Sequence, residues 1–285
     1  MAQGGHDDRA VLDKALDGID VVYHLAKATG QRWQDYVAGD VEPTRVLAEA
    51  ALAHKVKRFI YTGTIDSHYS ANANDVITCD TPVDANLTHR NLYARSKAAC
   101  EALLQKMHTE QGLPLVVFRP GVVIGAGSPP AHWGVGMFHS DTRAQLWGDG
   151  TTKLPLVLVD DVAEGLALGM STPGIEGQTF LLIDEPLLTA REYISAVEAA
   201  TATRISAPAH PIWKFYALDV AKETVKHLIR HPNRRVPSYR DWDCRSHRAR
   251  YDSKKTTTVL GWKPAGTREA IVSAGIVDAA KSYFR

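Results

Sequence analysis

The feature that most constrains the fold is an alternation between apolar runs of strand length and amphipathic stretches of helix length. The run Ile19 to Ala26 (IDVVYHLA) is almost continuously apolar, as expected of a strand covered on both faces. A helix-forming stretch, Thr44 to His54, separates it from a second strand-like run, Lys57 to Gly63. Strands that alternate with helices in this way form parallel βαβ units, so the sequence predicts an α/β fold with a parallel sheet.

The alternation continues along the chain and later changes character. Tyr93 to His108 predicts a long helix, and Pro114 to Phe118 predicts a third strand. A further strand-like run, Leu156 to Val159, leads into another helix, after which Pro, Trp and His become more frequent. We therefore predict a larger domain over residues 1–150 and a smaller substrate-binding region over residues 151–285, interleaved with the first.

Charge, cysteine content and hydropathy narrow the class of protein. The 285-residue chain has 33 Lys and Arg against 32 Asp and Glu, a formal charge of +1, which favours neither a nucleic acid nor a strongly acidic partner. Cys79, Cys100 and Cys244 have no CxxC spacing, which suits a reducing compartment. No apolar run approaches the ~20 residues that span a bilayer, and the first ten residues have no leader-like pattern. We expect a cytoplasmic protein without membrane contact.

The segment YARSK places a tyrosine and a lysine four residues apart. Positions i and i+4 of a helix lie on one face, so Tyr93 and Lys97 are expected to project together. A phenol has a pKa of ~10 in water, and a neighbouring ammonium favours its ionised form. Such a pair can exchange a proton with a substrate hydroxyl while a cofactor moves a hydride. Ordinary surface pairs share this spacing, so the motif alone proves little.

Three further motifs accompany this pair in order. HLA (His24 to Ala26) ends one strand, YTGT (Tyr61 to Thr64) ends the next, and RPGVVIG (Arg119 to Gly125) ends the third. Together with YARSK, the set resembles the extended short-chain dehydrogenase/reductases, the NAD-dependent epimerase/dehydratase family. The resemblance runs from about residue 7 to the C-terminal LGWKP and implies a Rossmann-like, doubly wound parallel sheet, with NAD(P) binding assigned to residues 1–150.

The resemblance also implies roles for single residues. Thr64 would hydrogen-bond the substrate oxygen, although a strand-end threonine can also simply satisfy a loop. Tyr93 would act as general acid or base. Lys97 would lower the pKa of that tyrosine and hold the nicotinamide ribose. Both Tyr93 and Lys97 would thus contact the cofactor, NAD or NADP, which would also meet the strand ends. The expected strand-end contacts are Leu25, Ala26, Thr62, Pro120 and Gly121.

One part of such a cofactor site has no counterpart. A dinucleotide-binding fold needs a glycine-rich turn between its first strand and helix, and no glycine cluster of this chain occupies that position. By resemblance, Asp8 matches a point just beyond the family's third strand, and Gly5 replaces the aspartate that reaches adenine. We therefore expect an N-terminally truncated sheet in which Ile19 to Ala26 becomes an open edge.

The resemblance further suggests a substrate class. Lys153 corresponds to a basic residue that sugar-nucleotide members place near the diphosphate, while a solvated loop lysine is an equal alternative. Arg143 and Trp147 are assigned to the same pocket by proximity in sequence only, and Asp66 is a further substrate-binding candidate. The run after the second strand lacks the glutamate of the dehydratase branch, which favours epimerase or dehydrogenase activity. Asp40 departs from the family, where many members carry an asparagine that meets the active site.

Residues 211 to 250 are locally basic and contain several aromatic residues. They could meet an anionic substrate or a lipid surface, although a solvated face over a core is the favoured interpretation. His227 and His231 have helical spacing that could share a metal, but the neighbouring cations oppose a divalent ion. We expect no metal site.

Two classes of function remain open. The first is an NAD(P)-dependent epimerase or dehydrogenase acting on a nucleotide-sugar or a similar hydroxyl-bearing small molecule. The second is a cofactor-incompetent family member or gene fragment with a binding or regulatory role. The missing glycine-rich turn favours the second, and the intact set Thr64, Tyr93 and Lys97 opposes it. The resemblance also implies a homodimer that pairs through the Tyr93 helix, and no nucleic-acid partner is expected.

Overall fold

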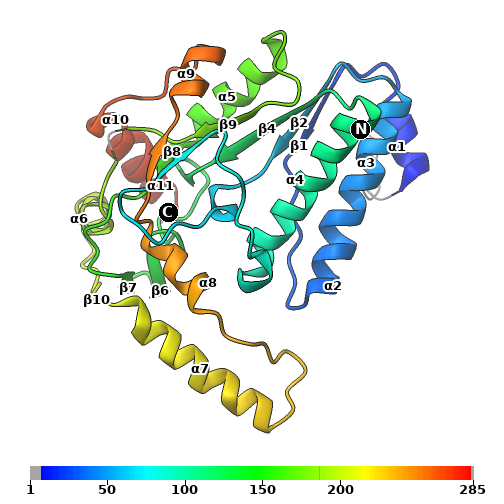
Figure 1. Cartoon of the computed structure of the whole chain (residues 1–285). Helices are drawn as coiled ribbons and strands as arrows, with labels where there is room; N and C mark the ends of the chain where they lie inside the picture. The colour runs from blue at the N-terminus through cyan, green and yellow to red at the C-terminus, as the bar shows by residue number, and fades with distance from the viewer. Residues whose placement is uncertain (1–7, 186, 284–285) are drawn as a thin grey trace.

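A computed structural model describes residues 8–185 and 187–283 and is organised around a four-stranded parallel sheet (Figure 1). The strands lie in the order β1 (Val21–His24), β2 (Arg58–Thr62), β4 (Leu115–Pro120) and β9 (Thr179–Leu182). Each neighbouring pair is parallel. The α/β class and the parallel sheet that the alternation predicts are confirmed. The departure expected at Gly5 lies outside the described residues.

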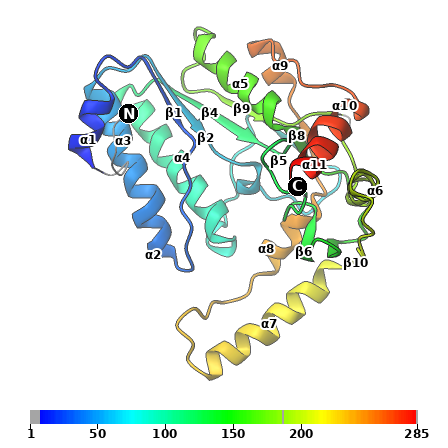
Figure 2. The same cartoon turned by 180° about the vertical axis from the view of Figure 1, so that it is seen from behind.

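Helices cover both faces of this sheet (Figure 2). One face packs against α1 (Arg9–Ala15), α3 (Glu42–Ala53) and α4 (Leu92–Gln111). The other packs against α5 (Val159–Ser171) and α9 (Lys254–Leu260). Because both faces of its central strands are covered, the sheet is doubly wound, as expected.

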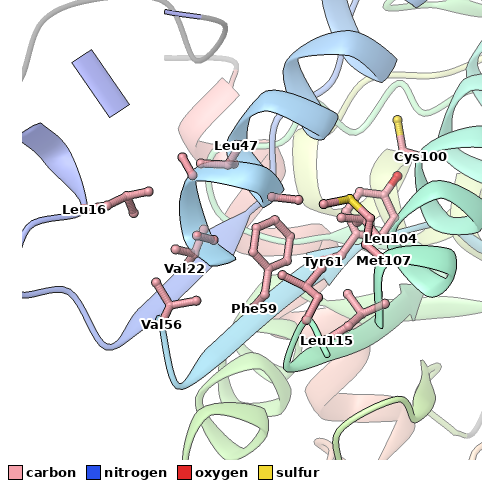
Figure 3. Packing of buried hydrophobic residues seen from close by; sticks show 14 of the residues in the cluster. Leu16, Val22, Leu47, Val56, Phe59, Tyr61, Cys100, Leu104, Met107 and Leu115 are labelled. Atoms are coloured by element: carbon pink, nitrogen blue, oxygen red, sulfur yellow. The ribbon is translucent and has the colours of Figure 1, made fainter. Parts of the chain in front are cut away.

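Alternate residues of the central strands enter different cores, as the two-residue period of a strand requires. In β4, Leu115 and Val117 pack among the residues from α3 and α4, whereas Val116 and Phe118 pack among those from α5 and α9. Figure 3 shows the first of these cores, with Phe59 and other strand residues against the two helices.

The helix that carries the predicted Tyr93–Lys97 pair has a defined start and end. The Asn91 side chain accepts a hydrogen bond of 2.9 Å from the Ala94 amide and so caps the first turn of α4. The helix ends at Gly112, whose φ of 76° lies in the left-handed region that favours glycine. The cap fixes where the first turn begins and thereby positions Tyr93 and Lys97.

The strand β1 forms one edge of the main sheet in the described chain. It is shorter than the predicted run Ile19 to Ala26. The side chain of Tyr23 is 39% exposed, and Leu25, just beyond the end of the strand, is 55% exposed. β1 is therefore an edge strand among the described residues, and the truncation of the sheet stays a prediction.

The remaining elements gather around the carboxyl ends of the main strands. β5 (Val122–Ile124) pairs with β8 (Leu156–Leu158), β3 (Val76–Thr78) pairs with β11 (Arg250–Asp252), and β7 (Arg143–Trp147) lies between β6 (Gly136–Ser140) and β10 (Ala209–His210). Apart from α7, the other helical segments are α2 (Trp33–Tyr36), η1 (Val37–Val41), η2 (Ile65–Ser67), η3 (Leu87–His89), α6 (Ala190–Thr201), α8 (Tyr239–Asp243), η4 (Cys244–Ser246), α10 (Arg268–Val272), η5 (Ser273–Val277) and α11 (Asp278–Tyr283).

Strands from both sides of residue 150 share sheets. β9 joins the main sheet, and β7 pairs with β10. The division of the chain at this residue stays a prediction.

The helix α7 (Ile212–Leu228) extends away from the body of the molecule, and residues 229–238 return from its far end to α8 (Figures 1 and 2). Over residues 8–185 and 187–283, no helix combines the length and the apolarity needed to cross a membrane.

Two valine substitutions on α5 test how closely this helix packs on the sheet. A Cβ at Gly169 would lie 2.6 Å from the Phe118 ring, whereas Ala167 on the same helix is exposed. We expect Gly169→Val to lower the free energy of unfolding by about 1–3 kcal/mol through overpacking. Ala167→Val should change it by less than about 0.7 kcal/mol. Urea unfolding followed by circular dichroism measures both, and equal effects would contradict this packing.

Candidate active site

A cavity of about 480 Å³ lies beyond the carboxyl ends of β1, β2 and β4. Its walls come from the residues that follow each strand, from the first turns of α4, and from two later segments. These later segments are residues 132–134 and a stretch that includes Cys244, Arg245 and His247. Segments distant in the sequence therefore meet at the edge where open α/β sheets bind their ligands.

Most of the residues that the resemblance assigned to catalysis and cofactor binding line this cavity. They are Leu25, Thr62, Thr64, Tyr93, Lys97, Pro120 and Gly121. Ala26 does not line it, but its carbonyl oxygen accepts a hydrogen bond of 2.8 Å from Lys97 Nζ. The structure thus brings the predicted set together, while the role of each residue stays a prediction.

The phenol of Tyr93 is held close to Thr64. Burial raises the pKa of Tyr93 above its usual value, the carboxylate of Asp66 raises it further, and a hydrogen bond with the Thr64 side chain acts in the opposite direction. Burial is the largest of these effects, and the resemblance-based role of Lys97 in lowering the pKa of Tyr93 stays a prediction.

The ammonium of Lys97 is also buried. Burial lowers the pKa of Lys97, the nearby Asp40 carboxylate opposes this shift, and the Lys27 ammonium adds to it. Asp40 lies in the π-helical segment η1, where it is 1% exposed and accepts a hydrogen bond of 2.6 Å from Ser96 Oγ. Asp40, where the resemblance led us to expect an asparagine, therefore places a buried carboxyl group near the Lys97 ammonium.

Lys27 is a cavity residue that the sequence analysis missed. It follows the HLA motif directly, lines the cavity, and places its Nζ 5.8 Å from the centroid of the Tyr93 ring. Its position immediately after the first strand end was the available signal, because strand-end residues of parallel sheets face the ligand site.

Asp66 also lines the cavity, but other side chains hold its carboxylate. Arg90 Nη2 donates to Oδ1 at 2.9 Å, and Asn91 Nδ2 donates to Oδ2 at 2.9 Å. The guanidinium of Arg90 is fully buried. These contacts fix the segment between β2 and α4, and substrate binding by Asp66 stays a prediction.

Three predicted substrate contacts lie away from the cavity. Lys153 borders a separate cavity of about 850 Å³ and pairs with Glu192 at 3.5 Å. Arg143 is an exposed residue of β7. Trp147 is only 4% exposed and packs behind the cavity wall, where its Nε1 donates a hydrogen bond of 2.8 Å to the Trp133 carbonyl oxygen. Their assignment to one substrate pocket is corrected: Arg143 lies at the exposed start of β7, Trp147 is buried at its other end, and Lys153 follows the strand and borders the separate cavity.

Several polar atoms at the cavity have no hydrogen-bond partner within the part of the chain that the structure describes. Thr62 Oγ1, Arg245 Nε and His247 Nε2 are buried, and all three residues line the cavity. Burial of an unsatisfied polar atom costs free energy, so these three atoms are unusual features beside the cavity. The described residues contain no cluster of three or more His, Cys, Asp or Glu side chains arranged to hold a metal ion.

Comparison with curated proteins finds relatives of low identity. An uncharacterized UDP-glucose epimerase, YtcB, from Bacillus subtilis is 24% identical over 60% of this chain and 55% of its own length. A 2-alkyl-3-oxoalkanoate reductase from Shewanella oneidensis is 23% identical over 80% of this chain and 62% of its own length. The chain therefore spans less than two thirds of the length of either relative.

Comparison with solved structures finds the same fold. UDP-glucuronic acid 4-epimerase from Bacillus cereus, solved with NAD, superposes with a TM-score of 0.70 at 20% identity, covering 95% of this chain and 76% of the epimerase. The protein gox2253 gives a TM-score of 0.78 at 22% identity, covering 99% of this chain and 84% of its own.

A family model supplies the classification. It describes the NAD dependent epimerase/dehydratase family and matches residues 1–181, which is more than half of the chain. The four motifs of the resemblance all lie within the matched residues. The chain belongs to the NAD dependent epimerase/dehydratase family.

Proposed function

We propose that the chain is an NAD(P)-dependent epimerase or dehydrogenase that moves a hydride to or from a hydroxyl-bearing small molecule. The observation that carries this proposal is that Thr64, Tyr93 and Lys97 line one cavity at the carboxyl ends of the parallel strands. A strand-end hydroxyl beside a tyrosine and a lysine on one helix face can hold a substrate oxygen and exchange its proton.

The reactive half of a dinucleotide fits this cavity. Thr62 Oγ1 is a buried atom without a partner in the described residues, and it lies among the predicted cofactor contacts. Thr62 and Lys97 would hold the nicotinamide ribose, and Pro120 and Gly121 would form the wall beside it. When bound, the dinucleotide supplies the hydride acceptor or donor. No glycine-rich turn, which would receive the pyrophosphate, follows β1 in the described chain. The fit therefore concerns only the nicotinamide half of the cofactor.

The protonation state of Tyr93 defines its part in each direction of the reaction. Because burial raises its pKa, the phenol keeps its proton at neutral pH. Tyr93 can therefore donate this proton to a carbonyl oxygen that becomes a hydroxyl. For the opposite direction Tyr93 must first lose its proton, and Lys97 would stabilise the resulting phenolate.

A nucleotide-sugar is the first candidate substrate. The similar proteins include enzymes named for UDP-glucose and UDP-glucuronic acid. Such a substrate presents a ring hydroxyl to Tyr93 and carries a diphosphate. Since Lys153 lies away from the cavity, we assign the anion to Lys27, which lines it.

An oxo acid with an apolar chain is the second candidate, and the cavity walls favour it. Leu25, Val122 and Trp133 give the walls an apolar character, while Lys27 supplies a cation for a carboxylate. The relative from Shewanella oneidensis is named a 2-alkyl-3-oxoalkanoate reductase.

Cofactor binding separates these proposals from a cofactor-incompetent family member. We would titrate the purified chain with NADH and NADPH and follow nucleotide fluorescence. Saturable binding supports an enzyme, whereas a folded chain that binds neither nucleotide supports a binding or regulatory role. Product assays would then use nucleotide absorbance for oxo acids and chromatography for UDP-sugars, because epimerisation causes no net change in the cofactor.

A Tyr93→Phe variant tests the proton-transfer role. Removing the phenolic oxygen should lower kcat by about 100-fold or more, while the Kd for NADH changes by less than about threefold. Steady-state kinetics and the fluorescence titration provide the two measurements.

Tyr23→Phe is the matched control, because Tyr23 is 39% exposed on the edge strand and lies outside the cavity. Its kcat should stay within about twofold of the wild type. A Tyr93→Phe enzyme that turns over as fast as this control would remove Tyr93 from the mechanism.

Two lysine variants test which residue meets the substrate anion. Lys27→Met should raise KM about 10-fold or more, because a charge-assisted hydrogen bond is lost. Lys153→Ala should change KM by less than about twofold, since Lys153 borders a different cavity and pairs with Glu192. KM is measured for the substrate that the product assays identify, and the opposite ranking of the two variants would restore Lys153 to the site.

A further inference from the structure

The outward face of α7 is apolar, which reverses the usual arrangement of a surface helix. Its inward face buries Ile212, Phe215, Asp219 and Glu223. Its outward face exposes apolar side chains at helical spacing. These are Trp213 (58%), Leu218 (68%), Val225 (56%) and Leu228 (79%), together with the exposed Ala217 and Ala221. Single exposed apolar residues are normal, but a row of them on one face marks a binding surface.

The apolar surface continues past the end of α7. Ile229 is 65% exposed and Val236, on the returning segment, is 83% exposed. We call residues 212–238 the arm. The arm projects from the body (Figures 1 and 2). Its returning segment meets the loop after β1, where the Asn233 side chain donates a hydrogen bond to Gln31.

The charge that the arm presents to solvent is positive. It contains six lysines and arginines against two carboxylates, Asp219 and Glu223. Both carboxylates are buried and used internally: Arg235 Nη2 binds Asp219 at 2.6 Å, and Lys226 Nζ binds Glu223 at 2.7 Å. The remaining cations, Lys214, Lys222, Arg230 and Arg234, are exposed.

An apolar stripe bordered by cations, with a tryptophan near one end, is complementary to an anionic lipid surface. A second copy of this arm would place like charges opposite each other, which opposes pairing through the arms. We propose that the arm docks on the surface of an anionic bilayer and lies in its interfacial plane. This proposal replaces the expectation that membrane contact is absent, and it is independent of the proposed catalytic function.

Vesicle co-sedimentation of the full chain tests the proposal. The vesicles contain either phosphatidylcholine alone or phosphatidylcholine with ~30% phosphatidylserine. We expect at least ~10-fold tighter binding to the anionic vesicles, weakened at ~0.5 M salt because salt screens the cations. Equal binding to both kinds of vesicle, or no binding to either, would overturn the proposal.

Substitutions locate the docking surface. The double variant Leu218→Glu, Leu228→Glu should bind anionic vesicles at least ~10-fold more weakly, because it removes two apolar side chains from the stripe and replaces them with negative charges. Met170→Glu is the matched control on α5, where Met170 is 46% exposed, and it should leave binding within ~2-fold. Thermal melting confirms that each variant folds. Equal binding by the double variant and the control would exclude the arm.

The oligomeric state distinguishes a lipid surface from a second copy of the chain as the partner of the arm. Light scattering in the absence of lipid measures the mass of the wild type and of the double variant. A mass independent of the double substitution supports lipid docking. A dimer that the double substitution converts to monomers would show that a second copy covers the arm and would overturn the proposal.

Discussion

The position of the candidate catalytic residues depends on one buried guanidinium. The Arg90 side chain donates to the Asp66 carboxylate at 2.9 Å and to the Asp84 carboxylate at 3.2 Å, and it also binds the His68 carbonyl oxygen at 2.7 Å. Its neighbour Asn91 caps α4. Arg90 thus ties the segment after β2 to the start of α4, the two elements that carry Thr64 and Tyr93. Removing a partner from such a buried network is costly because the remaining charges lose their compensation.

The same network reaches the C-terminal region. Arg240 of α8 binds both oxygens of Asp84 at 2.7 and 2.8 Å, and Asp241 accepts a hydrogen bond of 2.7 Å from the Asn91 amide. The cap of α4 is therefore held from two directions, by residues about 150 positions apart. Geometry at Tyr93 is consequently a property of the whole chain rather than of the YARSK motif alone.

The sequence was sufficient for features that depend on local periodicity. The strand β2, the helix α4 and the shared face of Tyr93 and Lys97 follow from apolar runs and from i, i+4 spacing. The sequence was not sufficient where pairing between distant strands decides which surroundings a side chain enters. Trp147 was assigned to a pocket beside Lys153, but pairing of β7 with β10, some sixty residues later, directs its ring into an aromatic core. Likewise, no local pattern could indicate that Arg245 and His247 complete the wall.

That aromatic core lies between the arm and the cavity. Trp242 Nε1 donates to Asp219 of α7 at 2.9 Å, and the Trp242 ring stacks on Phe215 with centroids 5.9 Å apart. The Arg245 guanidinium, whose residue lines the cavity, lies 4.6 Å from the centroid of Trp242 and 5.6 Å from that of Trp133. Close-packed aromatic rings resist small displacements because each shift forfeits contacts. The contacts therefore form a continuous path of packed side chains from α7, through Trp242, to Arg245 and Trp133 at the cavity wall.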